Sequence, residues 1–254
     1  MFKLIKEYCQ YYFDNYNVKH QYRDAWLKIR EIRYKQIRNN NFYLDTDSET
    51  FKKEVLQFWE GDKYCKGYNY GESYMRTNDE EKILFQNRDG ETPKAEIVLS
   101  EIDNLILRGN YSWSNLHMGG NITEDMSKLS KTVKYLLDEK INIKKRINNV
   151  LNDDGKYRIK GMNKGKNTIF LHMKYPDKYG VWNGPVDSTF RILDKSDYRF
   201  KIRESNLGKK YKKMNDLLNW LKNEYNSKKY KNGFKNLSDV DIFVWYIADK
   251  FSKI

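Results

Sequence analysis

The sequence predicts a mainly α-helical protein that folds as a helical bundle. Apolar residues recur at three- and four-residue spacing in several segments, which is the pattern of an amphipathic helix. Residues typical of helix ends, chiefly Asn, Asp, Ser, Thr and Gly, separate these segments. A chain of 254 residues with 15% aromatic residues can bury a core without disulfides or metal ions, so we expect a single helical domain over residues 1–254.

The N-terminal part of the chain predicts a helical extension of this domain. An apolar face with helical spacing precedes Asn39, and a second helix is predicted to begin at Ser48. Residues 61–76 are rich in glycine, tyrosine and lysine and predict a loop. Such a loop can stack on bases and touch phosphates, but the same composition also occurs in ordinary surface loops. We expect residues 1–91 to pack on a core formed by residues 92–254.

The predicted core begins with a helix at Thr92-Pro93, where threonine can cap the helix and proline suits its first turn. Apolar residues at helical spacing then predict helices after Thr123, over residues 143–151, and over residues 209–225. A last helix is predicted to begin at Ser238, whose hydroxyl is expected to cap it. Its broad apolar stripe should be buried, and this stripe consists of Val240, Phe243, Val244, Ile247 and Phe251.

The formal net charge of +13 bears on partners rather than on fold, and it favours a polyanion such as DNA. A lysine-rich, AT-rich coding bias produces the same excess, so charge alone leaves both explanations open. Residues 201–235 carry eleven Lys or Arg against three acidic residues. This stretch is either a solvated helix face or a rim that contacts phosphates.

The thiols and imidazoles are too few for a disulfide scaffold or a Cys/His zinc site, because the chain holds only Cys9, Cys65 and three histidines. We therefore expect no metal and no cofactor, and a reducing cytoplasmic location. No segment approaches the roughly 20 apolar residues of a membrane helix. The start Met1-Phe2-Lys3 does not resemble a secretory signal. We expect a monomer without membrane contact.

Residues 157–193 combine a glycine-containing turn, a short apolar helix and an acid at the start of the next helix. The turn is predicted around Gly161, with Ile159 and Met162 facing inward. With its flanking helices, over residues 141–175, it predicts a helix-hairpin-helix motif, whose backbone N–H groups can approach a phosphate. A plain connecting turn between packed helices is the alternative. The expected contacts to the DNA backbone are Lys160, Gly161, Asn163, Lys164, Gly165 and Lys166.

The short helix is expected to end at Pro176, and His172 on it is expected to pack internally rather than act as a ligand or base. A Trp-Asn-Gly-Pro loop then leads to Asp187. An aspartate at such a place is commonly an N-cap, but its carboxylate can also sit at a rim and face a ligand. Four aromatic residues are candidates for a base pocket, although each can equally be an ordinary core residue: Tyr111, Trp113, Tyr179 and Trp182.

The order of hairpin, short apolar helix and Val186-Asp187-Ser188-Thr189-Phe190-Arg191-Ile192 resembles the helix-hairpin-helix DNA glycosylase superfamily. The resemblance covers roughly residues 157–193. It implies double-stranded DNA as substrate, a base flipped into a pocket, and Asp187 as the catalytic carboxylate. The spacing from Gly161 to Asp187 is longer than usual in that superfamily. Bifunctional members carry lysine where this chain has Gly165, so the resemblance implies a monofunctional enzyme.

A second resemblance covers residues 160–183, which are similar to small helical modules attached to McrB-like restriction ATPases. Those modules are presumed to recognise DNA, and the acid after their aromatic loop need not be catalytic. The chain lacks the Walker A motif of the ATPase itself. The sequence therefore leaves two functions. One is a glycosylase that excises a damaged or modified base, including hypermodified phage bases, in anti-phage defence or repair. The other is a non-catalytic module that binds modified DNA in a restriction or defence system.

Overall fold

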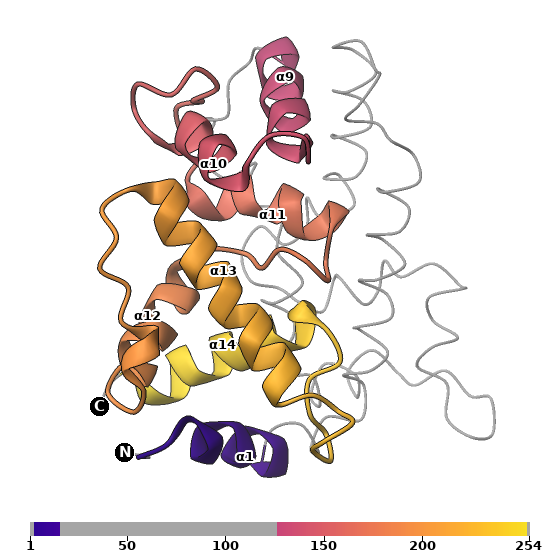
Figure 1. Ribbon diagram of the computed structural model, residues 1–254, viewed down its shortest axis with the longest axis vertical. Coiled ribbons are helices and arrows are strands. Elements are labelled where there is room, and N and C mark those ends of the chain that lie inside the picture. The colour runs from indigo at the N-terminus through magenta and orange to yellow at the C-terminus, as the bar shows by residue number, and fades with distance from the viewer. Residues whose placement is uncertain (1–2, 16–125, 253–254) are drawn as a thin grey trace, which may run out of the picture. The chain divides into compact units, whose positions relative to one another are not determined.

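The computed structural model describes residues 3–15 and 126–252, which are coloured in Figure 1. The chain divides into two compact units, and every described residue belongs to the unit formed by residues 1–18 and 121–254. The other unit, residues 19–120, lies outside the described residues. The helices expected there and the expected division into extension and core therefore stay predictions.

The described residues are helical, which confirms the predicted mainly α class. No β-strand occurs among them, apart from an isolated bridge between Asn226 and Phe234. Most helices lie on predicted segments, but neither the 3₁₀ helix over residues 198–200 nor a separate helix over residues 5–15 was predicted. The helices of the described residues run in the following order. They are α1 (Ile5–Asn15), α9 (Met126–Leu137), α10 (Ile143–Leu151), α11 (Lys164–Lys174), α12 (Gly184–Leu193), the 3₁₀ helix η2 (Tyr198–Phe200), α13 (Leu207–Glu224) and α14 (Leu237–Phe251).

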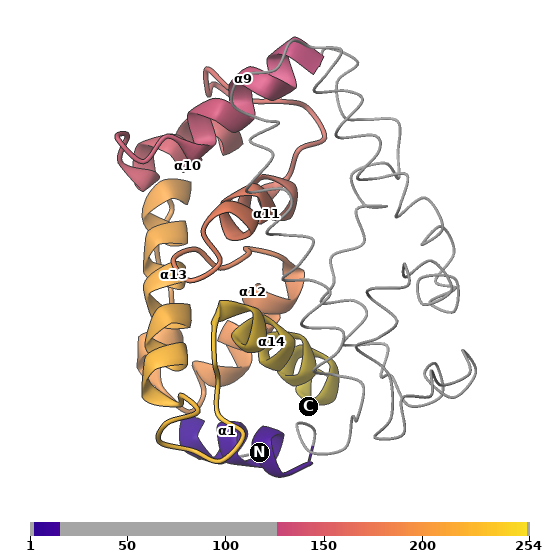
Figure 2. The same ribbon diagram turned by 90° about the vertical axis from the view of Figure 1, so that its right-hand side faces the viewer.

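Helix α14 packs against α12, α13 and α1. It is buried nearly all round, as its thick apolar stripe predicts, and even Ser238, Asp239 and Asp241 on it are enclosed. Helix α13 also packs along α10, and α9 packs on both α10 and α11. Figures 1 and 2 show the result, in which α13 runs beside α12 and α14 toward the end of the unit that holds α9 and α10.

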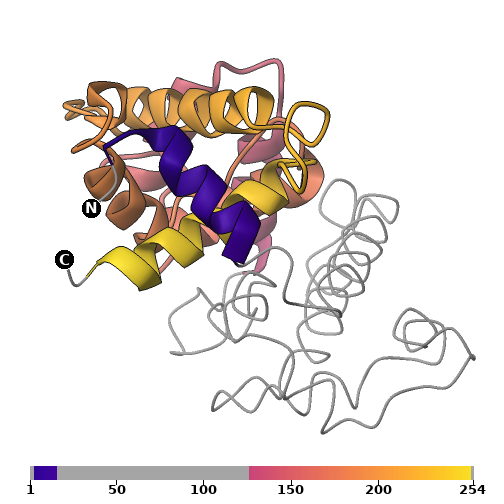
Figure 3. The same ribbon diagram turned by 90° about the horizontal axis from the view of Figure 1, so that it is seen from below.

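Helix α1 joins this unit through aromatic side chains, although it is far from α14 in sequence. The Tyr12 ring meets Phe243 and Tyr246 of α14 at centroid distances of 5.3 and 5.4 Å. Tyr8 meets Phe251 edge-on at 5.3 Å. Figure 3, in which the molecule is seen from below, shows that α1 crosses α14. Edge-to-face aromatic contacts of this kind add to the free energy of burial, so the N-terminal helix is anchored to the last one.

Asparagine side chains cap the N-termini of α10, α11, α12, α13 and α14. In each case the side-chain oxygen accepts a hydrogen bond from a backbone N–H of the first turn, which has no partner within the helix. The cap of α14 is Asn236, so the prediction that Ser238 caps this helix is wrong. The Ser238 hydroxyl instead contacts His172 Nε2 at 3.0 Å, and His172 is buried as expected.

The start of α13 is held tightly against α10. Gly208 N–H donates to Asn148 Oδ1 at 2.7 Å, and a Cβ at Gly208 would overlap the carbonyl oxygen of Lys144. Only glycine permits this approach without moving the α10 backbone. The contact places the first turns of α13, and Lys210 with them, at a set position beside α12.

The segment between α10 and α11 contains the turn predicted around Gly161. Gly161 has a positive φ of 85°, and Met162 N–H donates to Ile159 O at 3.1 Å. Ile159 and Met162 are buried, as expected, and the Arg158 side chain donates to the carbonyl oxygens of both. The turn is therefore closed, and α11 begins directly after it. Its description as a helix-hairpin-helix motif stays a prediction.

Candidate functional site

The carboxylate of Asp187 does not cap its own helix. Asn183 does so, because its Oδ1 accepts from Val186 N–H at 3.0 Å and its carbonyl accepts from Asp187 N–H at 3.3 Å. Pro185 fits the first turn, where a backbone N–H would have no helical partner. The side chain of Asp187 is therefore available for groups outside α12.

Two side chains from other parts of the chain hold this carboxylate. Trp182 Nε1–H donates to Asp187 Oδ1 at 3.0 Å, and the Lys164 ammonium pairs with Oδ2. The Lys164 nitrogen also lies 5.1 Å from the centroid of the Trp182 ring. We call these three residues the Lys–Trp–Asp cluster. It forms where the N-terminal ends of α11 and α12 meet, and both helix dipoles favour a negative charge there.

Trp182 is the fixed member of this cluster. Its backbone N–H donates to Thr168 Oγ1 at 2.8 Å, and its ring stacks on Tyr211 of α13 with centroids 6.2 Å apart. The Tyr211 hydroxyl in turn donates to Gly180 O at 2.9 Å. Trp182 is only 2% exposed, whereas the side chains of Lys164 and Asp187 remain 34% and 31% exposed. The indole thus aims its N–H from the interior at a carboxylate that solvent or a ligand can reach.

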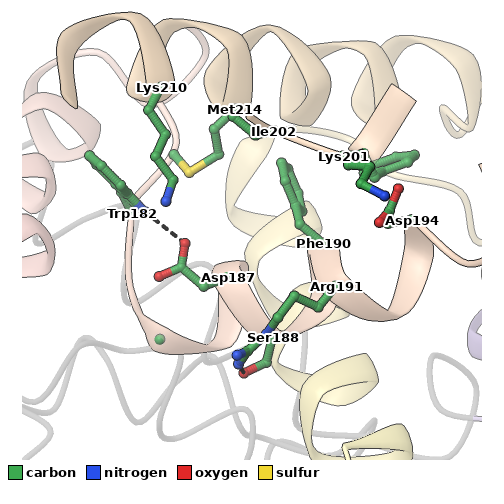
Figure 4. A pocket seen from close by; sticks show the side chains of 12 residues that line it. Trp182, Asp187, Ser188, Phe190, Arg191, Asp194, Lys201, Ile202, Lys210 and Met214 are labelled. Carbon is green, nitrogen blue, oxygen red and sulfur yellow. Dashed lines mark hydrogen bonds between the residues drawn. The ribbon is translucent and has the colours of Figure 1, made fainter. Parts of the chain in front are cut away.

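A pocket of about 490 Å³ opens beside Asp187 between α12 and α13. Figure 4 shows Asp187 and Phe190 projecting from α12 toward Lys210 and Met214 on α13. Apolar surface and charge alternate around it. The lining residues are Trp182, Gly184, Asp187, Ser188, Phe190, Arg191, Asp194, Phe200, Lys201, Ile202, Lys210 and Met214. Its volume is in the range of small-molecule sites, but about half of its lining residues are charged or carry a hydroxyl group.

Two of the four aromatic candidates for a base pocket are described, and of these Trp182 lines this pocket and Tyr179 does not. Tyr179 is buried elsewhere, where its hydroxyl donates to Glu139 Oε1 at 2.8 Å and accepts from Arg146 at 2.9 Å. Tyr111 and Trp113 lie outside the described residues. The structure therefore brings together Asp187 and Trp182 and places Tyr179 in a separate polar network.

The residues expected to contact a DNA backbone gather at the turn and the first turn of α11. Lys160 and Asn163 are exposed, and Gly161, Lys164, Gly165 and Lys166 are half-buried. Asn163 is the N-cap of α11 and accepts from Lys166 N–H at 3.1 Å. Partial burial lowers the pKa of the Lys166 ammonium from its usual value. Lys164 is the residue that links this group to Asp187.

Several pocket residues were not selected from the sequence. Phe190 and Arg191 follow Asp187 by three and four residues. Residues at this spacing share one face of a helix, so the sequence could have indicated both. Phe200, Lys201, Lys210 and Met214 come from η2, the loop after it and α13. Of these, Lys201 and Lys210 belong to the excess of basic residues over positions 201–235, and Met214 belongs to the apolar face of the helix predicted over residues 209–225.

No family model matches the chain, and no curated protein or solved structure matches it. Among residues 3–15 and 126–252, no group of His, Cys, Asp and Glu side chains is placed to hold a metal ion. Within the same ranges no helix has the length and apolar character needed to cross a bilayer. The chemistry of the site must therefore be inferred from its own residues. They are a carboxylate that is about one-third exposed, its two donors, and an adjoining pocket with aromatic and cationic side chains.

Proposed function

We propose that the protein is a monofunctional DNA glycosylase, in which Asp187 is the catalytic carboxylate and the adjoining pocket receives a flipped base. The observation that carries this proposal is the arrangement at Asp187. Asn183 caps the helix, so the Asp187 carboxylate is not needed as the cap. The carboxylate lies at the edge of a pocket lined by aromatic and basic residues. A purely structural helix cap has neither property.

The proposed chemistry follows from the bond that is broken. Cleavage of an N-glycosidic bond develops positive, oxocarbenium-like charge on the sugar, and an ionised carboxylate next to it stabilises that charge and orients water. The N–H of Trp182 and the ammonium of Lys164 hold the Asp187 carboxylate in one orientation. Because Trp182 is buried, its role in this scheme is to aim the carboxylate, while the half-buried Ile202 in the pocket lining offers apolar surface to the base.

The DNA backbone is assigned to the turn before α11. Lys160, Lys164 and Lys166 supply charge there, at the N-terminus of α11, which is the positive end of the helix dipole. Such contacts hold the duplex without reading its sequence, so the pocket selects the target. The proposed substrate is double-stranded DNA with a damaged or modified base, including hypermodified phage DNA. The proposed setting is anti-phage defence or repair in the cytoplasm, by a monomer that needs no cofactor.

One observation favours a second candidate, a non-catalytic module that binds modified DNA. Both oxygens of Asp187 already have partners within the chain, one in Trp182 and one in Lys164. An ion pair of this kind can simply join α11 to α12. In this alternative the pocket holds a modified base and no bond is broken.

A comparison of Asp187→Asn with a matched control separates the two. Wild type and variants are incubated with genomic DNAs, including phage DNAs with hypermodified cytosine or thymine. Abasic sites are counted, and released bases are identified by mass spectrometry. We expect D187N to lower the rate by about 100-fold or more, since a charge next to the reacting sugar is lost. Asp216→Asn also removes the acid of a Lys–Asp pair, at 2.6 Å on the exposed face of α13, and should change the rate by less than roughly threefold.

Two results would count against the glycosylase. Abasic-site formation that D187N leaves unchanged would remove Asp187 from the chemistry. DNA binding by the wild type without any abasic sites, on every DNA in the panel, would favour the binding module.

A further inference from the structure

The charge of the pocket bears on the kind of base that it receives. Three cationic side chains line it, Arg191, Lys201 and Lys210, against the carboxylates of Asp187 and Asp194. The charge of Asp187 is already countered by Lys164, which pairs with it and is not among the residues that line the pocket. The space next to the carboxylate is therefore cationic on balance.

Lys210 is the cation that faces Asp187. It lies in the first turn of α13, whose position is set by the close contact of Gly208 with α10. Its ammonium points into the pocket in Figure 4, and it lies 5.7 Å from the centroid of the Trp182 ring. Lys210 is half-buried, whereas its neighbours Lys209 and Lys212 are exposed. A base placed between α12 and α13 would have Asp187 on its sugar side and Lys210 beside its ring.

We infer that this pocket takes a neutral base that departs as an anion, and that Lys210 stabilises the departing charge; this inference rests on the proposed glycosylase function. A base alkylated on a ring nitrogen is already cationic, and it leaves as a neutral molecule. Lys210, Lys201 and Arg191 repel such a base in the bound state and gain nothing when it leaves. A neutral base accepts the electron pair of the broken bond, and a fixed ammonium nearby favours that transition state.

The step balances as a hydrolysis. The bond between C1′ and the base nitrogen breaks, and its electron pair goes to the base. A water oxygen forms the new bond to C1′, and the proton that it loses passes to the Asp187 carboxylate. The base anion, held by the Lys210 ammonium, takes one proton from solvent, and Asp187 returns its proton to solvent. One water is consumed, and the products are an abasic site and a neutral free base.

The test uses the full-length protein and single-turnover rates at saturating protein, so that weaker DNA binding does not enter. The panel contains duplexes with a single uracil, 5-hydroxymethyluracil or 7-methylguanine, together with phage DNAs that carry hypermodified pyrimidines. Released bases are identified by mass spectrometry. Lys210→Met removes the ammonium and keeps the apolar stem, and Lys210→Arg keeps the charge. Lys212→Met, on the exposed face of the same helix, is the control, and thermal unfolding checks that all variants fold.

We expect release of neutral bases only. K210M should lower that rate by about tenfold or more, K210R should restore most of it, and K212M should leave it unchanged. Release of 7-methylguanine as fast as of any neutral base, or a K210M rate equal to the wild-type rate, overturns the inference and leaves the glycosylase intact. If wild type releases no base from any DNA, the proposed glycosylase fails and the inference with it.

Discussion

The Lys–Trp–Asp cluster can be compared with a second polar group built from the same kinds of side chain. In that group, which we call the Arg–Tyr–Glu network, Glu139 accepts from the Tyr179 hydroxyl and from the guanidinium of Arg146. Arg146 also donates to Leu136 O at 2.7 Å and to the Tyr179 oxygen at 2.9 Å. Each group thus has one carboxylate, one aromatic donor and a cation that pairs with the carboxylate, and the network has a second cation because the exposed Lys178 also pairs with Glu139. Each group joins separate segments of the chain.

The difference lies in which member is buried. In the Arg–Tyr–Glu network the cation is enclosed, with Arg146 only 2% exposed and several of its N–H groups bonded within the protein. In the Lys–Trp–Asp cluster the aromatic donor is enclosed, and both charged groups keep about a third of their surface exposed beside a pocket. A buried cation whose terminal nitrogens bond within the protein locks helices together. A buried donor with exposed charges leaves those charges open to a ligand.

The largest effect expected from this comparison is on stability. Arg146→Met should lower the free energy of unfolding by about 3 kcal/mol or more, because Glu139 and the carbonyl of Leu136 lose a buried partner. Lys164→Met should lower it by less than about 1 kcal/mol, since an ion pair that is one-third exposed is screened by solvent. Urea unfolding of both variants measures this. Equal losses would mean that the Lys–Trp–Asp cluster is also a structural lock.

The helices of both groups were predictable from the sequence, because the spacing of apolar residues is a local property. The inward orientation of Ile159 and Met162, the packing of His172 and the burial of α14 followed from such patterns. The cap of α14 did not, because Asn236 and Ser238 are both good capping residues and only the packed helix decides between them.

The contents of the pocket were less accessible to sequence reasoning. Lys210 and Phe200 line the same pocket as Asp187 only because tertiary packing brings segments together that are distant in the sequence, and the spacing of apolar residues does not record this. Tyr179 and Trp182 stand three residues apart in one aromatic loop, yet they belong to different groups. The Tyr179 hydroxyl accepts a hydrogen bond from Arg146 of α10, whereas the Trp182 ring stacks on Tyr211 of α13. The sequence was sufficient to select Asp187 as the candidate acid. The residues around it are brought together by tertiary packing and could not be predicted from the sequence.

A smaller effect is expected when the buried donor is changed and the charges are kept. Trp182→Phe retains a large aromatic ring and removes the N–H that aims Asp187. We expect the rate of abasic-site formation to fall roughly tenfold, because a misaimed carboxylate stabilises the transition state less well. Trp245→Phe on α14 is the control for the loss of an indole, and single-turnover rates are measured for both. A W182F rate that matches the W245F rate would mean that the Trp182 N–H does not position the carboxylate.

The smallest effect concerns acid stability, and it sharpens the account of Glu139. Burial alone would raise the pKa of this carboxyl, but hydrogen bonds from Lys178, Tyr179 and Arg146 outweigh it and hold the pKa below the usual value of 4.5. A carboxyl whose pKa is lower in the folded than in the unfolded state stabilises the fold above its unfolded pKa. That contribution is lost as the pH falls through the folded pKa.

We therefore expect Glu139→Gln to be less stable than wild type by a constant margin from pH 8 to about pH 5, and this margin should shrink as the pH falls below about 4.5. Urea unfolding at half-unit pH steps measures it. Lys178→Met removes one of the three donors, so it should move the decline of the margin toward higher pH without abolishing it. Parallel stability curves for wild type and E139Q down to pH 3 would show that Arg146 holds its helices together without help from the charge of Glu139.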